Sequence, residues 1–562
     1  MFVRKISLVL LAGLILAACS PESPQPQVEQ NASQSALAVP DKFSAQVSED
    51  ILRAGGNAVD AAVAAGFALA VTLPEAGNIG GGGFMLIHMN GEDAFLDYRE
   101  KAPLATNRDM YLDENGEVIE NATLIGGQAA AVPGTVAGFW AAHKRYGKLP
   151  WASVVMPAVR LAADGFEPHE QLVDHVRGVE DWFGDQVNFN DYFAHMAEGK
   201  IFRQADLDAT LTRIADFGPD DFYRGETARM LIDQMNRSNG LITLQDLDAY
   251  EAIWREPLRS AWRDYEILSA PPPSSGGFAI VQLLKMKDYL AHYFDDVSHN
   301  SPQYIHLVAE MEKRVFADRA EYLGDPDSVD MDMDALLDDD YIARRAQEVD
   351  PDRIADLNSV QPGLESPDTT HYSIMDRWGN AVSNTYTINW DFGSGVVVEG
   401  AGFVLNNEMD DFSAKPGVPN IFGVVGSTAN EIQPGKRPLS SMSPTILLKN
   451  GEVAIVIGTP GGSTIFTSVF QNIVNMLDFD MTPGEAVGAT RFHHQLLPPD
   501  LVTFSPKRPL PQETISALGD RGYRAEPHFF AFGDLQVIRR TGDKLEAASD
   551  PRRRGESRIV TH

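Results

Sequence analysis

The sequence is poor in cysteine and in basic residues, and both shortages exclude classes of protein. Its 562 residues include one cysteine, so no disulfide can form within the chain. Lys and Arg number 46 against 79 Asp and Glu, and the formal net charge of −33 disfavours nonspecific binding to nucleic acid. Because 44% of the residues are hydrophobic and 9% aromatic, the chain can bury a large core, which excludes general disorder.

Several common catalytic motifs are missing as well. The chain has no GxSxG, HExxH or CxxC pattern, and the glycine run Gly80–Gly83 lacks the residues of a phosphate loop, so it predicts a tight backbone turn near a site. His493 and His494 are adjacent without an acidic or cysteine partner at ligand spacing, so we expect them to be structural and expect no metal or other cofactor. The acidic run 325–340 lacks EF-hand spacing and predicts a solvated surface, and Arg552–Arg554 predict a solvated tail.

The N-terminal segment is typical of an exported lipoprotein. Arg4 and Lys5 precede an apolar stretch too short to span a bilayer, and Leu16-Ala17-Ala18-Cys19 resembles a bacterial lipobox. We expect residues 1–18 to be a signal peptide and Cys19 to carry a lipid in the bacterial periplasm, at either membrane. The Pro-, Gln- and Ser-rich residues 19–40 predict a flexible tether. The alternative is an ordinary signal peptide with an incidental cysteine.

The charge and the residue composition of the chain change near residue 369. The part before this position has a net charge of −30, and the part from it to the end has −3. An alanine-rich helix is predicted within 51–73, and helical patterns dominate 104–355. Beyond 369, segments rich in Val, Ile, Tyr and Thr predict a sheet covered by a helix, with strands at 369–376, 380–389, 400–406 and 453–459, a hairpin turn at 376–380 and the helix at 463–476. Helices and sheet in layers are the predicted class.

The same boundary carries a candidate nucleophile, in Asp368-Thr369-Thr370-His371. A threonine hydroxyl is a poor nucleophile and needs a nearby base. A cut before Thr369 would supply one, because a free α-amine has a pKa of about 8 and is partly unprotonated at neutral pH. Thr-Thr pairs are also common in strands, so the pair alone decides nothing.

The surrounding motifs resemble the γ-glutamyltranspeptidases, a family of N-terminal nucleophile hydrolases. Five of them occur in the family order: DYREKAP (97–103), DTTHYS (368–373), NNEMDDFS (406–413), PLSSMSPT (438–445) and GTPGGS (458–463). GGNAVDAA (55–62), LPEAGNIGGGGFM (73–85) and ADRAEYLGDPD (317–327) extend the resemblance from about residue 42 to the C-terminus. It implies an α+β fold, the four-layer αββα sandwich of these hydrolases.

The resemblance also implies how the chain matures and which residues act on the acyl group. The precursor would cut itself between Asp368 and Thr369 into a large subunit, 41–368, and a small subunit, 369–562, that stay together. Thr369 would be the nucleophile, and the Thr387 hydroxyl would help to activate it. Gly461 and Gly462 would present backbone N–H groups as the oxyanion hole.

A donor with a γ-glutamyl end carries a carboxylate and an ammonium, so its site needs opposed charges. By resemblance, Arg99 grips the carboxylate with Ser440 and Ser441, and the ammonium is held by Asn389, Glu408 and Asp411. The implied reaction is acyl transfer through a Thr369 ester, from glutathione or other γ-glutamyl compounds to water, amino acids or peptides. Membrane contact is expected only through the lipid.

Three positions depart from the family pattern. Asp368 precedes the nucleophile where glutamine is frequent, Glu408 stands where many bacterial members have glutamine, and Phe422 replaces a common tyrosine in a predicted lid loop. We expect retained processing and a changed balance of transfer to hydrolysis. The alternatives are an acylase acting on glutaryl-cephalosporins or poly-γ-glutamate, which Asp411 disfavours in the glutaryl case, and a non-processing lipoprotein that binds peptides.

Overall fold

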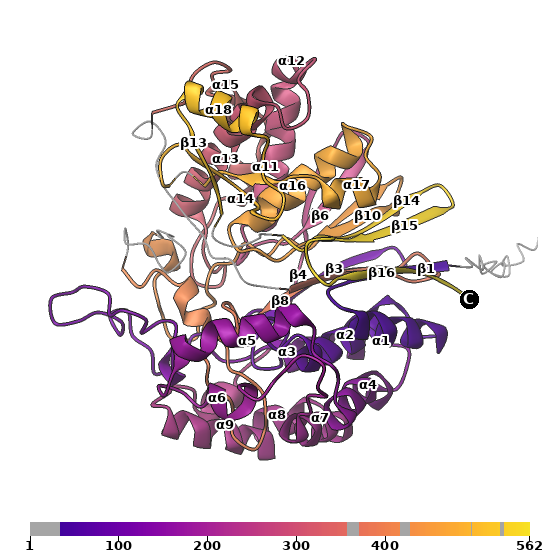
Figure 1. The fold of residues 1–562 in the computed structure, drawn as a ribbon, viewed down its shortest axis with the longest axis vertical. Coiled ribbons are helices and arrows are strands. Elements are labelled where there is room, and N and C mark those ends of the chain that lie inside the picture. Colours follow the sequence, from indigo (N-terminus) through magenta and orange to yellow (C-terminus); the bar gives the residue numbers. More distant parts are fainter. Residues whose placement is uncertain (1–33, 357–369, 416–426, 496, 529–532) are drawn as a thin grey trace, which may run out of the picture.

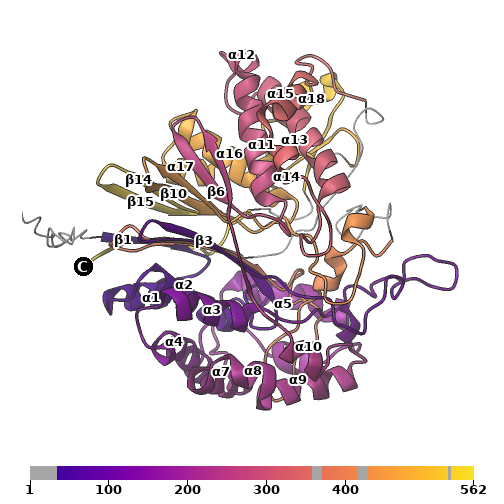
Figure 2. The same cartoon turned by 180° about the vertical axis from the view of Figure 1, so that it is seen from behind.

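A computed structural model gives the fold and describes residues 34–356, 370–415, 427–495, 497–528 and 533–562. Cys19, Asp368, Thr369 and Phe422 therefore lie outside the described residues. The described chain forms four layers, with two stacked sheets inside and helices outside (Figures 1 and 2). The prediction of an αββα sandwich is confirmed.

Both inner sheets are antiparallel throughout. The first has the order β16 (Glu556–Thr561), β1 (Gln34–Val39), β7 (Thr370–Met375), β8 (Ala381–Thr387), β2 (Gly82–Met89), β3 (Glu92–Tyr98) and β4 (Ile253–Arg255). The second has the order β15 (Lys544–Ser549), β14 (Gln536–Thr541), β10 (Glu452–Gly458), β9 (Thr445–Lys449), β6 (Tyr265–Ser269) and β5 (Leu258–Trp262). A small third sheet contains β11 (Phe492–His493), β12 (Leu501–Phe504) and β13 (Arg524–Pro527).

The helices divide between the two outer faces (Figure 1). Those beside the first sheet are α1 (Lys42–Arg53), α2 (Ala58–Thr72), α3 (Thr135–Tyr146), α4 (Trp151–Asp164), α5 (Glu170–Phe183), α6 (Phe189–Phe193), α7 (Ala205–Phe217), α8 (Pro219–Arg224), α9 (Glu226–Arg237) and α10 (Leu244–Asp248). Those beside the second are α11 (Gly276–Tyr289), α12 (Ala291–Phe294), α13 (Pro302–Tyr322), α14 (Met333–Leu337), α15 (Asp339–Gln347), α16 (Thr464–Leu477), α17 (Pro483–Gly488) and α18 (Gln512–Arg521).

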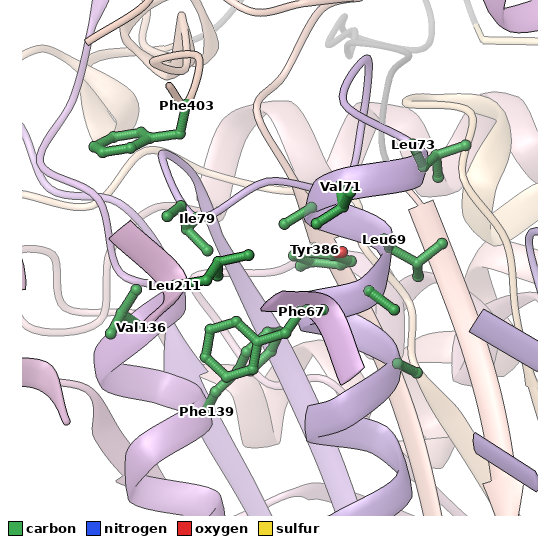
Figure 3. Close-up of a cluster of buried hydrophobic side chains, with 14 of the residues drawn as sticks. Phe67, Leu69, Val71, Leu73, Ile79, Val136, Phe139, Leu211, Tyr386 and Phe403 are labelled. Atoms are coloured by element: carbon green, nitrogen blue, oxygen red, sulfur yellow. The ribbon is translucent and has the colours of Figure 1, made fainter. Parts of the chain in front are cut away.

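Helix α2 is the alanine-rich helix that the sequence predicts, and all of its residues are buried. Asn57 and Asp60 form a capping box that fixes its first turn. Its small side chains let other elements approach closely. Phe67 packs edge-on against Phe139 with 5.2 Å between ring centroids, and the ring of Tyr386 lies beside them (Figure 3). The hydroxyl of Tyr386, in β8, donates a hydrogen bond to the Gly66 carbonyl at 2.9 Å. The helix thereby fixes the strand that ends at Thr387.

Alternation along the strands builds the cores on both faces of the first sheet. In β2, Phe84 and Leu86 point into the apolar layer between the two sheets, whereas Met85 and Ile87 point toward the helices. The layer between the sheets is completed by Ile446 and other side chains from the second sheet. Two faces are buried, which is why these strands read as continuous apolar runs.

Several predicted elements are confirmed. Strands β7, β8 and β10 and helix α16 lie where the sequence predicts them, and Asp376 N–H donates to the Asn380 carbonyl at 2.9 Å to close the predicted hairpin turn. Helices dominate 104–355 as expected, but the hairpin β5–β6 within that range was not predicted. The prediction of a strand at 400–406 is wrong, because this segment forms only an isolated bridge between Val397 and Val404.

Three surface predictions also need correction. Gln34–Val39, assigned to the flexible tether 19–40, forms β1 between β16 and β7. The acidic run 325–340 is not wholly solvated, because Asp325 is buried and accepts a hydrogen bond from the Arg437 N–H at 2.8 Å. Arg552–Arg554 do not form a solvated tail: Arg552 is buried and pairs with Asp550 at 2.9 Å.

Candidate active site

Most of the predicted site residues lie at one edge of the first sheet, the edge that is formed by the ends of its strands. Register places Thr370 opposite Tyr386, Thr387 opposite Gly82 and Gly83 opposite Tyr98. The start of β7, the end of β8, the start of β2 and the end of β3 therefore meet at this edge. Arg99 follows β3 directly, and Thr369 would precede β7 directly, although it lies outside the described residues.

The glycine run makes this edge possible. A Cβ on Gly81 would lie 1.9 Å from the Thr387 carbonyl oxygen, and one on Gly80 would lie 2.0 Å from the Val404 carbonyl oxygen. The Gly81 carbonyl also accepts the N–H groups of Gly134 and Thr135, at 2.8 and 3.0 Å, at the start of α3. The run thus permits close backbone approach, as a turn near a site requires.

Thr387 ends β8 and is almost fully buried. Its Oγ1 accepts the backbone N–H of Asn389 at 2.8 Å. Asn389 adopts the left-handed conformation, with φ of 75°, and its side-chain amide donates to the Asn407 carbonyl at 3.1 Å. The chain therefore turns sharply after Thr387. The side chain of Asn389 connects this turn to residues 407–411, which include the predicted donor-binding residues Glu408 and Asp411.

Gly461 and Gly462 lie between β10 and α16. Both have positive φ, 129° and 54°, a conformation that favours glycine, and their carbonyls accept the N–H groups of Thr464 and Ile465 at 3.0 Å. Gly461 lines the same cleft as Thr370, the residue after the predicted nucleophile. The N-terminus of a 14-residue helix follows, and its dipole favours negative charge there.

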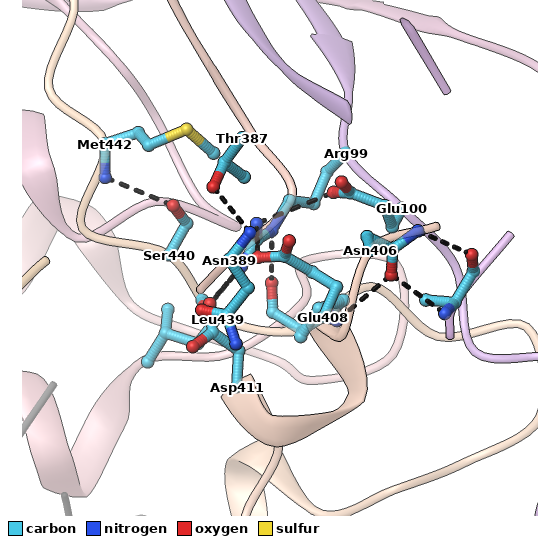
Figure 4. Close-up of polar contacts among 12 residues, drawn as sticks. Arg99, Glu100, Thr387, Asn389, Asn406, Glu408, Asp411, Leu439, Ser440 and Met442 are labelled. Atoms are coloured by element: carbon cyan, nitrogen blue, oxygen red, sulfur yellow. Dashed lines mark hydrogen bonds and ion pairs between the residues drawn. The ribbon is translucent and has the colours of Figure 1, made fainter. Parts of the chain in front are cut away.

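Arg99 is the centre of a buried ion-pair network (Figure 4). Its guanidinium donates one Nη to Glu408 and the other to Asp411, and Nη1 lies 3.5 Å from a Glu100 oxygen. Nε and Nη2 also donate to the carbonyls of Pro438 and Leu439, both at 3.3 Å. The side chains of Arg99, Glu100 and Glu408 are at most 1% exposed, whereas Asp411 is 11% exposed.

Three carboxyl groups thus surround one guanidinium, and ionising all three would bury an excess of negative charge. Burial raises the pKa of Glu408 well above its usual range and raises that of Glu100 to about 7, although Arg99 opposes both shifts. A positive group entering beside Asp411 would relieve this excess. The arrangement therefore suits a ligand end that brings a carboxylate to Arg99 and an ammonium to the acidic residues.

The two serines that were predicted to bind the donor's carboxylate lie close by. Ser440 Oγ accepts the N–H of Met442 at 3.1 Å, and Ser441 Oγ lies 3.5 Å from the hydroxyl of Ser275. Neither hydroxyl bonds Arg99 among the contacts described. The structure thus brings Arg99, Asn389, Glu408, Asp411 and Ser440 together (Figure 4). Ser441 lies beside Ser275.

Arg319 of α13 was missed as a site residue. It is 3% exposed, its Nε donates to Ser275 Oγ at 3.0 Å, and Ser275 Oγ donates to the Ser440 carbonyl at 3.0 Å. Burial lowers its pKa well below the usual range, and Asp411 opposes the shift. The only sequence signal was its place in the ADRAEYLGDPD motif, which assigned it no role.

The adjacent histidines are buried in the third sheet region. His493 Nδ1 lies 3.0 Å from Thr467 Oγ1, and His494 Nδ1 lies 2.8 Å from the Leu501 carbonyl oxygen. Burial lowers the pKa of His493 to about 3 and that of His494 to about 4. Within the described ranges, no cluster of three or more His, Cys, Asp or Glu residues is arranged to hold a metal ion.

Comparison with known proteins identifies the family of this chain. The model of the family described as Gamma-glutamyltranspeptidase matches residues 44–560. The chain is 56% identical to a glutathione hydrolase proenzyme of Pseudomonas aeruginosa, over 93% of this chain and 94% of the relative, and 43% identical to that of Escherichia coli, over 98% of both.

Two solved structures and one further sequence relative are also similar to this chain. A γ-glutamyltranspeptidase from Pseudomonas nitroreducens complexed with L-DON is 53% identical over 58% of this chain and 97% of that chain, with a TM-score of 0.57. A cephalosporin acylase from Bacillus halodurans is 26% identical over 97% of this chain and 99% of that chain, with a TM-score of 0.82. An acylase proenzyme from a Pseudomonas species is 37% identical over 78% of this chain and 79% of the relative. The chain belongs to the γ-glutamyltranspeptidase family.

Proposed function

We propose that this protein transfers the γ-glutamyl group of glutathione, or of another γ-glutamyl compound, to water or to an amino acid or peptide. The observation that carries the proposal is the buried network of Arg99, Glu408 and Asp411 at the sheet edge where β7 begins. A γ-glutamyl end brings a carboxylate and an ammonium in a fixed arrangement. Arg99, buried beside Glu408 and Asp411, offers an opposite charge to each of these two groups.

We propose a catalytic cycle in which Thr369 is both the processing and the catalytic nucleophile. Cleavage between Asp368 and Thr369 yields the subunits 41–368 and 369–562 and frees the α-amine that deprotonates the hydroxyl. Thr369 Oγ attacks the donor's γ-carbonyl carbon, the N–H groups of Gly461 and Gly462 stabilise the oxyanion, and cysteinylglycine leaves with a proton. Water or an amine then resolves the ester.

Within this cycle, the donor's carboxylate displaces Glu408 or Asp411 from Arg99, and its ammonium takes their place beside the freed carboxylates. Asn389 and Ser440 line the same site, and Thr387 holds the turn that places Asn389. Ser441 contributes to the donor site through its contact with the hydroxyl of Ser275. Each charged group of the donor thus meets an opposite charge in the site, which offsets the cost of desolvating it.

Replacement of Thr369 tests the proposal. Wild-type precursor of 61.5 kDa should give two bands on denaturing electrophoresis and hydrolyse γ-glutamyl-p-nitroanilide. Thr369→Ala should give one band and no turnover, and Thr369→Ser should retain slow processing. Thr561→Ala, at an exposed position in β16, is the matched control and should behave as wild type. Two bands and wild-type turnover for Thr369→Ala would refute the mechanism, and a single inactive wild-type band would favour a peptide-binding lipoprotein.

An acylase is the second candidate, because two of the similar proteins are acylases. A glutaryl group has a carboxylate but no ammonium, so it would leave Glu408 and Asp411 without a positive partner once Arg99 was occupied. We expect γ-glutamyl-p-nitroanilide to be hydrolysed at least about tenfold faster than glutaryl-p-nitroanilide, since one charge-assisted hydrogen bond is worth about 1.5–3 kcal/mol. The reverse order would make the protein a glutaryl acylase.

We further propose that the protein is a periplasmic lipoprotein held at a membrane by lipidated Cys19, after removal of residues 1–18. None of the described helices is long and apolar enough to cross a membrane. Cys19→Ala should move the protein from the membrane fraction to the soluble periplasmic fraction, and labelled palmitate should enter the wild type alone. A wild-type protein that takes up no label would contradict lipidation.

A further inference from the structure

Asn430 connects two separate segments that contact Arg99. It ends η4 (Thr428–Asn430), a single turn of 3-10 helix, and is 6% exposed. Its side-chain amide uses both of its polar atoms: Oδ1 accepts the backbone N–H of Leu439 at 3.0 Å, and Nδ2 donates to the backbone carbonyl of Asp411 at 2.6 Å. One buried side chain thus bonds the backbone on both sides of the predicted donor site.

Asp411 and Leu439 also meet at the guanidinium of Arg99. Its Nη2 donates to a carboxylate oxygen of Asp411 and, at 3.3 Å, to the carbonyl of Leu439 (Figure 4). The two residues are therefore linked twice. One link passes through the Asp411 side chain and the guanidinium, and the other passes through the Asp411 backbone and the Asn430 amide. Removal of the first link leaves the second in place.

The turn that carries Asn430 is itself fixed. Lys436 is 1% exposed, and its Nζ donates to the carbonyls of the residues on either side of Asn430, at 2.7 and 3.1 Å. The Lys436 carbonyl in turn accepts the N–H of Ala102, three residues after Arg99, at 2.8 Å. Because the backbone around it is bonded in this way, the Asn430 amide keeps one orientation relative to Arg99.

In the proposed cycle the donor breaks the first of these links. Its carboxylate takes the guanidinium of Arg99, so the Asp411 side chain loses its cation and turns to the incoming ammonium. The Asp411 backbone, held by Asn430, keeps its place during this exchange. One carbon atom of a γ-glutamyl end carries both the carboxylate and the ammonium, so their spacing is fixed. A site whose cation and anion already have the matching spacing binds such an end at the least cost in order.

We infer that Asn430 is a positioning residue that sets the spacing between the cation and the anion of the donor site, and so selects acyl groups that carry an ammonium beside their carboxylate. The inference rests on the proposed γ-glutamyl transfer. Asn430 acts through the Asp411 backbone and does not contact the donor. Without its amide, Arg99 would still bind a carboxylate, but Asp411 would no longer be held where the ammonium arrives.

The two bonds of Asn430 need an amide. The Leu439 N–H needs an acceptor and the Asp411 carbonyl needs a donor, and an asparagine side chain supplies both. Asn430→Ala removes both bonds. Asn430→Asp keeps the acceptor for Leu439 and places a second oxygen opposite the Asp411 carbonyl, so it removes the bond to Asp411 alone. Its added negative charge would by itself favour an ammonium, so weaker binding of an ammonium in this variant reports the lost bond.

Paired inhibitors test the inference. L-Glutamate, the product of donor hydrolysis, carries both the carboxylate and the ammonium, and glutarate lacks the ammonium. Their inhibition constants are measured against hydrolysis of γ-glutamyl-p-nitroanilide. Wild type should bind L-glutamate at least about tenfold more tightly, equivalent to about 1.4 kcal/mol, because only L-glutamate pairs with Asp411. Asn430→Ala and Asn430→Asp should each bring this ratio to about one.

The kinetics of the donor give a second measure. The KM for γ-glutamyl-p-nitroanilide should rise about tenfold in both variants with kcat little changed, because the ammonium is bound equally in the ground state and the transition state. Asn188→Ala is the matched control. Asn188, at the start of α6, bonds both the N–H and the carbonyl of Val397 at 2.9 Å, so its loss removes the same two kinds of bond and should keep the wild-type ratio and KM.

The outcomes are distinct. An Asn430→Ala or Asn430→Asp enzyme that keeps the wild-type ratio of inhibition constants would overturn the inference, whatever its stability. Equal binding of L-glutamate and glutarate by wild type would overturn it without any variant, so it stays testable if the variants do not mature. Absence of donor hydrolysis in wild type would instead refute the proposed function.

Discussion

Gly81→Ala isolates the effect of backbone approach on the site. The added Cβ would lie 1.9 Å from the Thr387 carbonyl oxygen and 2.8 Å from Ile388 Cγ2. Real Cβ contacts are essentially never below 3.0 Å, so β2 and β8 must separate by about 1 Å at this point. The obstacle is backbone, which cannot rotate away as the end of a flexible side chain can.

Two consequences follow from a movement of that size. Thr387 and the turn to Asn389 would shift relative to Gly461, and a misplacement of about 1 Å can lower catalysis about 100-fold. Overpacking at a buried strand end costs about 1–3 kcal/mol, and the Gly81 carbonyl that accepts two N–H groups of α3 would move with it. We therefore expect kcat/KM to fall about 100-fold and the melting temperature to fall.

The assay is hydrolysis of γ-glutamyl-p-nitroanilide by purified enzyme, with electrophoresis to follow processing and calorimetry to follow stability. Gly178→Ala is the matched control, because Gly178 lies within α5 with nothing near its would-be Cβ. That change should leave activity unaltered and raise stability by up to about 1 kcal/mol through helix propensity. Wild-type kcat/KM and melting temperature in Gly81→Ala would refute the reasoning.

Three further changes test burial elsewhere in the fold. Glu312→Gln removes a buried carboxyl group whose pKa is raised well above its usual range by burial. The contribution of this group to stability is present below the ordinary pKa of glutamate and is lost as the pH rises through its pKa in the folded protein. The melting temperature of the variant should therefore rise relative to that of wild type between pH 5 and 9, and parallel curves of melting temperature against pH would contradict this. His371→Gln removes an imidazole whose pKa burial lowers to about 3; wild type should therefore lose stability as pH falls from about 6.5 toward 3, and acid titration of both proteins should show a shallower loss in the variant. Phe67→Ala empties a position packed 5.2 Å from Phe139 and 5.6 Å from Trp151 and should cost about 3–5 kcal/mol in denaturant unfolding; a loss below 1 kcal/mol would show that the cluster collapses around the gap.

Local patterns predicted the elements that depend on local chemistry. Strands β7 and β8 and the turn between them follow from β-branched residues bounded by Asp376 and Asn380, and α2 follows from its alanines and its cap. The segment 400–406 has the same composition without forming a strand, because a partner strand must lie alongside and none is paired there in the described chain. Pairing partners distant in sequence cannot be read from composition.

The same limit applies to charged residues. Arg552–Arg554 resemble a solvated run, yet Arg552 pairs with Asp550 and Arg554 pairs with Glu75, which lies near the other end of the chain. Motif resemblance supplied Arg99, Glu408 and Asp411, which the fold brings together, but it gave no role to Arg319 or to Glu100. Those residues act through contacts that only the folded chain reveals.

The position of β1 has a consequence for the life of the enzyme after cleavage. This strand precedes residue 41 and stays covalently joined to the proposed large subunit, 41–368, yet it is hydrogen-bonded on one side to β16 and on the other to β7, both from the proposed small subunit. The two products are therefore interleaved within one sheet, and neither can leave without breaking both ladders. Dilution should not separate them, so the cut chain behaves as a single cooperative unit whose survival is set by the rate of global unfolding rather than by a dissociation constant.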